Sequence, residues 1–465
     1  MDSIFSTYAA TLAARSFRTA IAIAAEFDLE IWQFDVIGAF LNAHISHTNP
    51  VLCELLDGFK KPRICVQLKR ALYGLRDSPL LWYEEFSSTL RKLGLLPSKE
   101  EPCLFFDKER RIFLLFYVDD ILLMHHKDHE KAAFKLMEQI KDTYDLEDRG
   151  AVNWFLGVRV IRDRVARTIA LVHDTYIDKI AKKFNLADTA LFPKIPLPTT
   201  ELVKNDRNAS RKEIKAYQER VGSVLYTAIM LRPDVAFAVS KLSHFLTNPS
   251  KAHQEAVDRL IIFLYNSRWE ALRYGGSVIP ELMICGDASF ADDPDTRRSS
   301  HGYIIMLFGG AIVWKAARQT TITTSTTEAE LLALEHVSKE AMALKRFFSE
   351  LMLDLGAAWR IYCDNQQTIR LVVGKNERIT TRLRHVDIQN MWLRQEHAKG
   401  SFEVQYLKTS DMPADGLTKS LSEQQFKRFK EQLKLQSMKK QITEQEDEEA
   451  GDWKAERTEC SRRWC

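Results

Sequence analysis

Residues 111–126 read RIFLLFYVDDILLMHH and place two adjacent carboxylates, Asp119 and Asp120, between two apolar runs. The runs at 112–118 and 121–124 have the composition of short buried strands, and Asp is a common turn residue. The stretch therefore predicts a β-hairpin with both acids at its turn. An ionised carboxylate is costly to bury unless it is paired or binds a metal. Two interpretations follow: both acids are solvated turn residues, or together they hold a cation.

A third acid, Asp35, lies in IWQFDVIGAFL (31–41), which reads as another strand with apolar neighbours on both sides. Carboxylates brought together from two strands can hold two divalent ions. Such a metal pair activates a 3′-hydroxyl and neutralises the departing pyrophosphate in an in-line displacement. One strand Asp and an Asp pair on a hairpin therefore suit a nucleotide polymerase.

Five sequence blocks resemble the reverse transcriptase of copia-type LTR retrotransposons, and they occur in the family's order. The blocks are QFDVIGAFLN, LKRALYGLRDSPLLWYEEF, FYVDD, WFLGVRV and VLYTAIMLRPDVAFAVSKLSHFLTNPSKAH. The resemblance implies that Asp35, Asp119 and Asp120 are the metal-binding catalytic aspartates of a polymerase palm.

The same resemblance implies a nucleotide-binding and template-binding set. Phe40 matches the aromatic residue that screens out a ribose 2′-hydroxyl, although a strand core residue explains it equally well. Tyr73 and Gly74 match the loop beneath the template base and the incoming nucleotide. The cations around that loop are candidates for phosphate contacts, although surface cations are usually only solvated: Lys69, Arg70 and Arg76.

A second set of acids follows residue 282, where an α/β pattern opens. It comprises Asp287 in GDASF, Glu328 and Glu330 in TTSTTEAELLAL, Asp364 in IYCDNQQ and Asp415 in PADGLTK. Each acid lies at the end of a predicted strand or in the first turn of a predicted helix, where it could also be a simple helix cap. Four acids in the order Asp, Glu, Asp, Asp on this pattern resemble ribonuclease H.

The resemblance implies catalytic and metal-binding roles for Asp287, Glu330, Asp364 and Asp415, with Glu328 as the alternative to Glu330. The two glutamates are two residues apart on a predicted helix, so only one can face the metals. We favour Glu330, because the Ala one turn behind it is typical of ribonuclease H helices. In such a site, water attacks a phosphodiester of RNA paired with DNA, and the 2′-hydroxyl identifies the RNA strand.

The length of 465 residues indicates two or three domains. We expect an α+β reverse transcriptase palm and thumb-like region followed by an α/β ribonuclease H-like domain. The predicted segments are a palm at 1–184, a connector and helical thumb region at 185–281, a ribonuclease H-like domain at 282–435 and a charged, disordered tail at 436–465. Seven scattered cysteines without a CxxC pair argue against a disulfide scaffold or a zinc module.

The resemblance implies two Mg²⁺ per active site, with Mn²⁺ as a substitute. The implied partners are an RNA template, a DNA primer, an RNA–DNA hybrid, dNTPs and other Pol or capsid products, in a cytoplasmic retrotransposon particle or the nucleus, with no membrane. Family members have a longer basic fingers region before the first Asp than the 34 residues present here. Three hypotheses remain: a polymerase with ribonuclease H, a ribonuclease H alone, or an inactive remnant that binds nucleic acid.

Overall fold

The computed structural model describes residues 8–46, 50–198, 200–276, 282–355, 359–374 and 384–444. Contacts divide the chain into two compact units. The first comprises Met1–Phe155 with Ala343–Asp354, and the second comprises Leu156–Met342 with Leu355–Cys465. No helix among the described residues is long and apolar enough to cross a membrane.

The first unit is built on a six-stranded antiparallel sheet in the order β4-β5-β6-β7-β1-β8. Its strands are β1 (Glu30–Val36), β4 (Leu96–Pro97), β5 (Leu104–Phe106), β6 (Ile112–Tyr117), β7 (Asp120–His125) and β8 (Leu146–Ala151). The helices are α1 (Ala14–Glu26), α2 (Ala39–Asn42), α3 (Ser78–Lys92) and α4 (Glu130–Lys141), and a separate hairpin pairs β2 (Leu52–Glu54) with β3 (Cys65–Gln67). The predicted hairpin is thus β6–β7.

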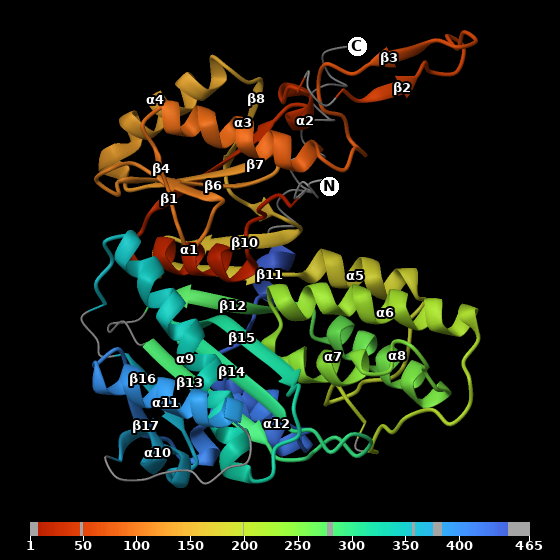
Figure 1. Ribbon diagram of the computed structural model, residues 1–465, viewed down its shortest axis with the longest axis vertical. Helices are drawn as coiled ribbons and strands as arrows, with labels where there is room; N and C mark the ends of the chain where they lie inside the picture. The colour runs from red at the N-terminus through yellow and green to blue at the C-terminus, as the bar shows by residue number, and fades with distance from the viewer. Residues whose placement is uncertain are drawn as a thin grey trace. The chain divides into compact units, whose positions relative to one another are not determined.

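Successive side chains along each strand point to opposite faces of this sheet, and apolar side chains occupy both faces. On one face the ring of Phe116 in β6 lies 5.0 Å from that of Phe86 in α3, and Trp32 in β1 lies 5.0 Å from Phe134 in α4. Figure 1 shows α3 and α4 on this side of the sheet and α1 on the other. The sheet is therefore covered by helices on both faces, as its apolar strands require.

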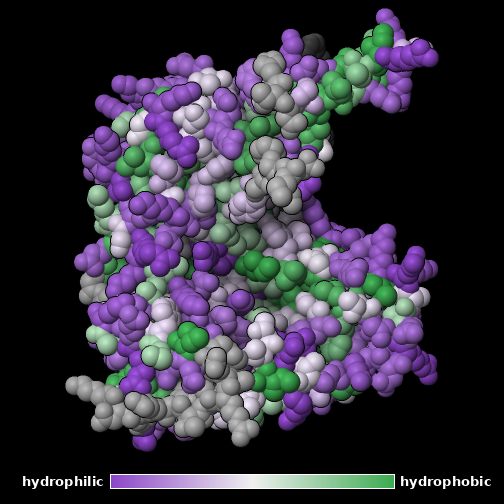
Figure 2. Space-filling model, viewed as in Figure 1, coloured by the Kyte–Doolittle hydropathy of each residue, from purple (hydrophilic) through white to green (hydrophobic). Residues whose placement is uncertain are grey.

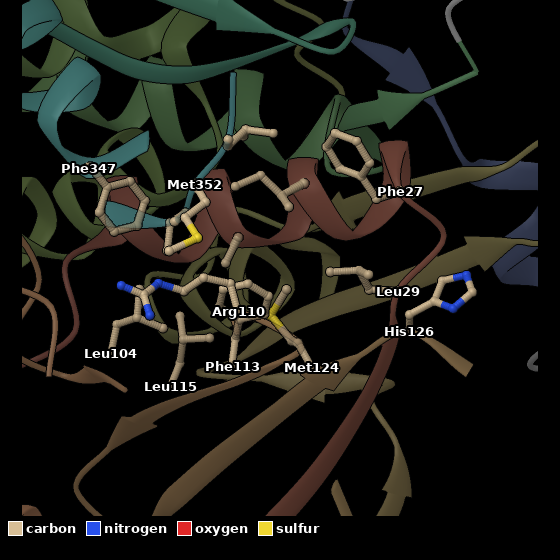
Figure 3. Close-up of a pocket in the computed structure, with 14 residues that line it drawn as sticks. Phe27, Leu29, Leu104, Arg110, Phe113, Leu115, Met124, His126, Phe347 and Met352 are labelled. Atoms are coloured by element: carbon tan, nitrogen blue, oxygen red, sulfur yellow. The ribbon is translucent and has the colours of Figure 1, made fainter. Parts of the chain in front are cut away.

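On the α1 face, a cavity of about 430 Å³ is lined almost entirely by apolar side chains. They include Phe113 and Leu115 of β6 and Met124 of β7, together with Phe347 and Met352 from the segment 343–354 (Figure 3). This segment, which includes the last turns of α9 (Thr326–Glu350), is therefore an integral part of the first unit.

The β2–β3 hairpin carries exposed apolar side chains. Leu56 and Phe59 are 78% and 71% exposed, and Leu52 and Ile64 are also exposed. Figure 2 shows hydrophobic surface along the protruding hairpin and hydrophilic surface at its tip. The tip contains Lys60. Strands β2 and β3 form a two-stranded sheet that is separate from the six-stranded sheet of this unit.

The second unit contains two sheets. One has antiparallel strands in the order β18-β12-β11-β10, and the other has the order β15-β14-β13-β16-β17, with β13, β16 and β17 parallel. The bounds are β10 (Val158–Asp163), β11 (Thr168–Val172), β12 (Glu270–Gly275), β13 (Leu282–Ser289), β14 (Ser300–Leu307), β15 (Gly310–Arg318), β16 (Arg360–Cys363), β17 (Glu403–Tyr406) and β18 (Gln436–Ser437).

Its helices are α5 (Asp174–Lys183), α6 (Arg211–Met230), α7 (Ala236–Ser243), α8 (Lys251–Asn266), α10 (Gln366–Val373), α11 (Arg384–Ala398), α12 (Glu423–Gln432) and the short η2 (Pro233–Val235), η3 (Thr409–Asp411) and η4 (Pro413–Leu417). The first part of α9, up to residue 342, also belongs to this unit, and Figure 1 shows α9 lying across the β13–β14 sheet. This mixed α/β architecture agrees with the predicted fold class at that coarse level.

Three predictions from the pattern differ from the structure. The predicted strand 31–41 ends at Val36, because Gly38 adopts φ +62° and starts the short helix α2. The β-branched and aromatic composition of WFLGVRVIRD (154–163) predicts a single strand, but the strand is interrupted after β9 (Trp154–Phe155), where Leu156 and Gly157 both have positive φ. The tail predicted from 436 begins with β18, which pairs with β12, while 445–465 lies outside the described residues.

Candidate active sites

The first carboxylate cluster lies where β1 meets the β6–β7 turn. Asp35 near the end of β1 stands directly opposite Asp120 at the start of β7 in the antiparallel register. Asp119 occupies the turn, and its carbonyl oxygen accepts a hydrogen bond of 2.9 Å from the Val36 amide. The turn is fixed from α3, because Trp82 Nε1 donates to the Val118 carbonyl at 2.7 Å. The sheet register therefore brings the three predicted polymerase acids together.

These acids repel one another, and neighbouring groups offset only part of their charge. Burial raises the pKa of Asp35, and the charges of Asp119 and Asp120 raise it further, whereas Arg149 lowers it. The Arg149 guanidinium lies 3.2 Å from Asp35 Oδ1. Burial also raises the pKa of Asp120, opposed by a 3.1 Å hydrogen bond from Gln33 Nε2 to Asp120 Oδ1. Such a cluster gains stability from a bound cation.

The aromatic residues predicted to contact nucleotide lie against each other. The ring of Phe40 is 4.6 Å from that of Tyr73, and Phe40 is buried whereas Tyr73 is 59% exposed. Burial raises the pKa of Tyr73, and the charges of Asp119 and Asp35 add to the effect, so its hydroxyl lies within electrostatic reach of the acids. Gly74 has φ +94°, a conformation that favours glycine.

The three predicted phosphate-binding cations are all exposed. Lys69 and Arg70 lie on a short pairing with residues 43–45, through the amide of Ile45 to the Lys69 carbonyl and an isolated bridge between His44 and Arg70. Arg70 Nη1 also donates to the Asn42 carbonyl at 2.5 Å. Arg76 lies in the loop before α3. Their exposure is compatible with phosphate contacts and with simple solvation.

The second cluster draws one acid from each of four elements in the second unit. Asp287 lies on β13, Glu330 near the start of α9, Asp364 immediately after β16 and Asp415 in η4. Glycines allow the close approach that this convergence needs. A Cβ at Gly286 would lie 2.9 Å from Val337 Cγ1 of α9, and one at Gly302 would lie 2.6 Å from Leu417 Cβ of η4. Glycine at these positions therefore lets α9 and η4 pack directly on the sheet.

The acids of this cluster are strongly coupled. Burial raises the pKa of Asp287 to about 7, and the charges of Asp364 and Asp415 contribute, while Thr418 opposes the rise. Burial, then Asp287 and Asp364, raise the pKa of Glu330 well above its ordinary value. Burial and the charge of Asp364 raise the pKa of Asp415, although Asp415 forms an ion pair with Lys419 that opposes the rise. In the absence of a cation, protons stabilise this site near neutral pH.

The structure separates the two glutamate candidates. Glu328 Oε2 accepts hydrogen bonds from the Thr324 amide at 2.7 Å and from the Thr324 hydroxyl at 2.8 Å, so its carboxylate is engaged at the helix start. The carboxylate of Glu330 is influenced by Asp287 and Asp364, and its Oε2 atom is buried without a hydrogen-bond partner among the described residues. This geometry favours Glu330 over Glu328 as the acid that faces the cluster.

Several residues that support the acids were not identified from the sequence. Thr418 Oγ1 donates to Asp287 Oδ2 at 2.5 Å, and Thr409 Oγ1 donates to Asp364 Oδ2 at 2.6 Å. Gln33 could have been found, because it lies two residues before Asp35 and shares a strand face with it. Arg149 carries no comparable signal, since only the β1–β8 pairing brings β8 beside Asp35.

The donor atoms present fit a divalent metal. Oxygen ligands from carboxylates are what Mg²⁺ and Mn²⁺ prefer. In the second cluster, ligand atoms of Glu330, Cys363 and Asp364 all lie within 4.8 Å of one another. The unpartnered Oε2 of Glu330 is the orphaned buried atom that a cation would satisfy.

Two solved structures resemble parts of this chain at low scores. Ribonuclease H1 from Halobacterium salinarum NRC-1 is 15% identical, with a TM-score of 0.22. The aligned region covers 30% of this chain and 93% of the ribonuclease chain. The foamy viral protease-reverse transcriptase dRH in complex with double-stranded DNA is 14% identical, with a TM-score of 0.21. The aligned region covers 82% of this chain and 59% of the viral chain.

Sequence comparison is more informative. Residues 2–197 match the reverse transcriptase (RNA-dependent DNA polymerase) family. The Retrovirus-related Pol polyprotein from transposon TNT 1-94 of Nicotiana tabacum is 35% identical over 453 residues, which are 94% of this chain and 33% of that polyprotein. The polyprotein from transposon RE1 of Arabidopsis thaliana is 28% identical, over 91% of this chain and 28% of its own length. This chain therefore spans about a third of the length of these plant relatives.

A shorter relative is matched over nearly its whole length. The putative transposon Ty5-1 protein of Saccharomyces cerevisiae is 30% identical over 313 residues, which are 66% of this chain and 99% of that protein. Together with the reverse transcriptase match, these relatives show that the chain belongs to the reverse transcriptase family of copia-type retrotransposon Pol polyproteins.

Proposed function

We propose that this chain carries out two phosphoryl-transfer reactions on nucleic acid, each at one of the two carboxylate clusters. The first cluster would extend a DNA primer on an RNA template with dNTPs, and the second would cut the RNA of an RNA–DNA hybrid. One observation supports both assignments: acids from separate elements lie close enough to raise one another's pKa. A fold does not maintain such repulsion for stability alone, which makes perturbed clusters functional candidates.

In the polymerase site, Asp35, Asp119 and Asp120 would hold two Mg²⁺ ions. A bound metal pair supplies charge neutralisation for the pyrophosphate and acidity for the primer 3′-hydroxyl. Gln33 orients Asp120 through its hydrogen bond, and Arg149 fixes one oxygen of Asp35. Phe40, whose ring packs on that of Tyr73, would limit the space for a ribose 2′-hydroxyl, and Tyr73 would lie beneath the template base and the incoming nucleotide.

In the ribonuclease H-like site, Asp287, Glu330, Asp364 and Asp415 would hold the metals. A bound metal pair there supplies an activated water and stabilises the leaving oxygen. Thr418 and Thr409 each hold one carboxylate oxygen of Asp287 and Asp364, which leaves the other oxygen of each for a cation. Lys419 is paired with Asp415 and would partly offset its charge.

Cleavage of a labelled RNA–DNA hybrid in Mg²⁺, with primer extension on an RNA template in parallel, tests this proposal. We expect Asp364→Asn and Glu330→Gln to lower hybrid cleavage by at least about 100-fold, because each removes a metal-binding charge. Glu328→Gln is the matched control on the same helix, and we expect it to retain most of the cleavage because Glu328 is engaged with Thr324.

Asp119→Asn should abolish primer extension without affecting hybrid cleavage, because Asp119 belongs to the first unit. Cleavage without extension in the wild type would leave only the ribonuclease H assignment. A folded protein with neither reaction would contradict the proposal and leave a nucleic-acid-binding remnant.

A further inference from the structure

A cysteine thiol lies inside the second carboxylate cluster. Cys363 is the last residue of β16, directly before Asp364, and its side chain is only 1% exposed. Its Sγ atom and one carboxylate oxygen each from Glu330 and Asp364 lie within 4.8 Å of one another. The amide of Asn365 donates toward the sulfur at 3.4 Å, which orients it in the turn that follows the strand.

The second relevant observation is the state of Glu330. Its side chain is 7% exposed, and Oε2 has no hydrogen-bond partner among the described residues. Since a buried polar atom of this kind is usually satisfied, it indicates a position for a cation beside the sulfur.

A ligand set of one sulfur and two carboxylates does not suit every metal equally. Mg²⁺ takes oxygen ligands and has no preference for a thiolate, whereas Zn²⁺ binds Cys sulfur and carboxylate oxygen in a tetrahedral site. Softer ions favour thiolates, and Zn²⁺ also exceeds Mn²⁺ in general affinity for such sites. The cluster thus offers thiophilic ions a ligand that the Mg²⁺ reaction does not use.

We propose that Zn²⁺ and Cd²⁺ bind at this site through the Cys363 sulfur and the carboxylates of Glu330 and Asp364, and that they exclude Mg²⁺ from it. On binding, the thiol proton passes to solvent and a metal–sulfur bond forms, with no change in oxidation state. Because Glu330 and Asp364 are shared, the two kinds of ion compete for the same carboxylates. Metal binding stands on the geometry alone, while inhibition of hybrid cleavage rests on the proposed function.

Cd²⁺ titration of the full chain, followed by ultraviolet absorbance of the cadmium–thiolate bond, tests the binding. Every sample carries serine at four other cysteines, so that they cannot contribute: Cys53, Cys65, Cys460 and Cys465. We expect absorbance that saturates at one Cd²⁺ per chain and is lost in Cys363→Ser. Cys103→Ser is the matched control, because Cys103 is equally buried but lies in the first unit.

Competition provides a second readout that does not require Cys363→Ser to fold. Added Mg²⁺ should shift the Cd²⁺ titration of the parent protein to higher concentration, and Asp364→Asn should weaken Cd²⁺ binding at least about tenfold. Saturable absorbance that persists in Cys363→Ser, or that ignores both Mg²⁺ and Asp364→Asn, would overturn the proposal.

The activity test separates this inference from the proposed function. With Mg²⁺ present, Zn²⁺ should inhibit hybrid cleavage, and Cys363→Ser should require at least about tenfold more Zn²⁺ for the same inhibition. Cleavage without any cadmium–thiolate absorbance would contradict the thiophilic site alone. Absorbance without cleavage would contradict the ribonuclease H assignment alone.

Discussion

At the residue scale, the two clusters differ in how their charge is compensated. Asp35 has a guanidinium at 3.2 Å from Arg149, so part of the negative charge in the first site is balanced by the chain itself. In the second site the described cation, Lys419, pairs with Asp415, while Asp287 is held by a neutral hydroxyl. Protons or metal ions must therefore supply most of the compensation in the second site.

The raised pKa of Asp287 predicts a pH dependence for the metal-free protein. Its pKa is about 7 in the fold against an ordinary value of 3.8, so between these values the native state binds more protons than the unfolded state. Stability that is present below pH 4 is therefore lost as the pH rises toward 7, by about 4 kcal/mol for a shift of this size.

Asp287→Asn cannot ionise, so its free energy of unfolding should change less with pH across this window than that of the wild type. Urea unfolding at a series of pH values without divalent ions measures the difference. Mg²⁺ should then restore wild-type stability at pH 7.5 but have less effect on the variant. Parallel pH curves for the two proteins would contradict the assignment of this pKa.

At the element scale, local sequence pattern identified the β6–β7 hairpin and the helix that carries Glu330, but not the points where strands are interrupted. The β6–β7 hairpin lies where the apolar pattern places it, because it depends on neighbouring residues. β1 is shorter than predicted because Gly38 adopts a left-handed conformation, which the apolar pattern does not reveal. The final turns of α9 are a different case: the helix was predicted, but not the unit on which it ends.

The attachment of α9 to the first unit predicts the effect of Glu350→Ala. The Glu350 carboxylate accepts hydrogen bonds from the Ser98 hydroxyl at 2.6 Å and from the Lys99 amide at 3.0 Å. Removing it should lower the free energy of unfolding of the first unit by about 2 kcal/mol, because hydrogen bonds to a charged group are lost.

Hydrogen exchange of peptides from β4 to β6 locates the effect, and urea unfolding measures it. Ser349→Ala is the neighbouring control, since the Ser349 hydroxyl donates to the Lys345 carbonyl within the same helix. Equal exchange in both variants would show that the end of α9 does not stabilise the first unit.

At the scale of the whole molecule, the sheet β15-β14-β13-β16-β17 is not an isolated domain within the second unit. Trp314 Nε1 of β15 donates to the Ala228 carbonyl of α6 at 2.9 Å, and the Tyr274 hydroxyl of β12 donates to the Ala311 carbonyl at 2.7 Å. Lys430 of α12 also pairs with Glu270 of β12. The predicted boundary between 281 and 282 therefore crosses a packed and hydrogen-bonded region.

These contacts predict that a fragment of residues 282–444 is less stable than a fragment of 156–444. The shorter fragment loses the partners of Trp314, Ala311 and Lys430 and exposes the surfaces they cover. Both fragments contain segment 343–354 without the first unit, so that defect cancels in the comparison. Thermal unfolding should show a cooperative transition at higher temperature for 156–444. Equal transition temperatures would support the prediction that 282–435 is an independent domain.

The sequence by itself determined the family, the order of the acids and the local elements that carry them. Motifs such as FYVDD and GDASF are short, and hairpins and helix starts are set by neighbouring residues. Only the tertiary structure decided that Glu330 faces Asp287 and Asp364 while Glu328 is engaged with Thr324, and that Arg149 lies beside Asp35. The thiol of Cys363 in the second site and the place of segment 343–354 in the first unit are further examples. The physical reason is common to all of them: these contacts join residues far apart in the chain, and periodicity describes only residues that are close together in it.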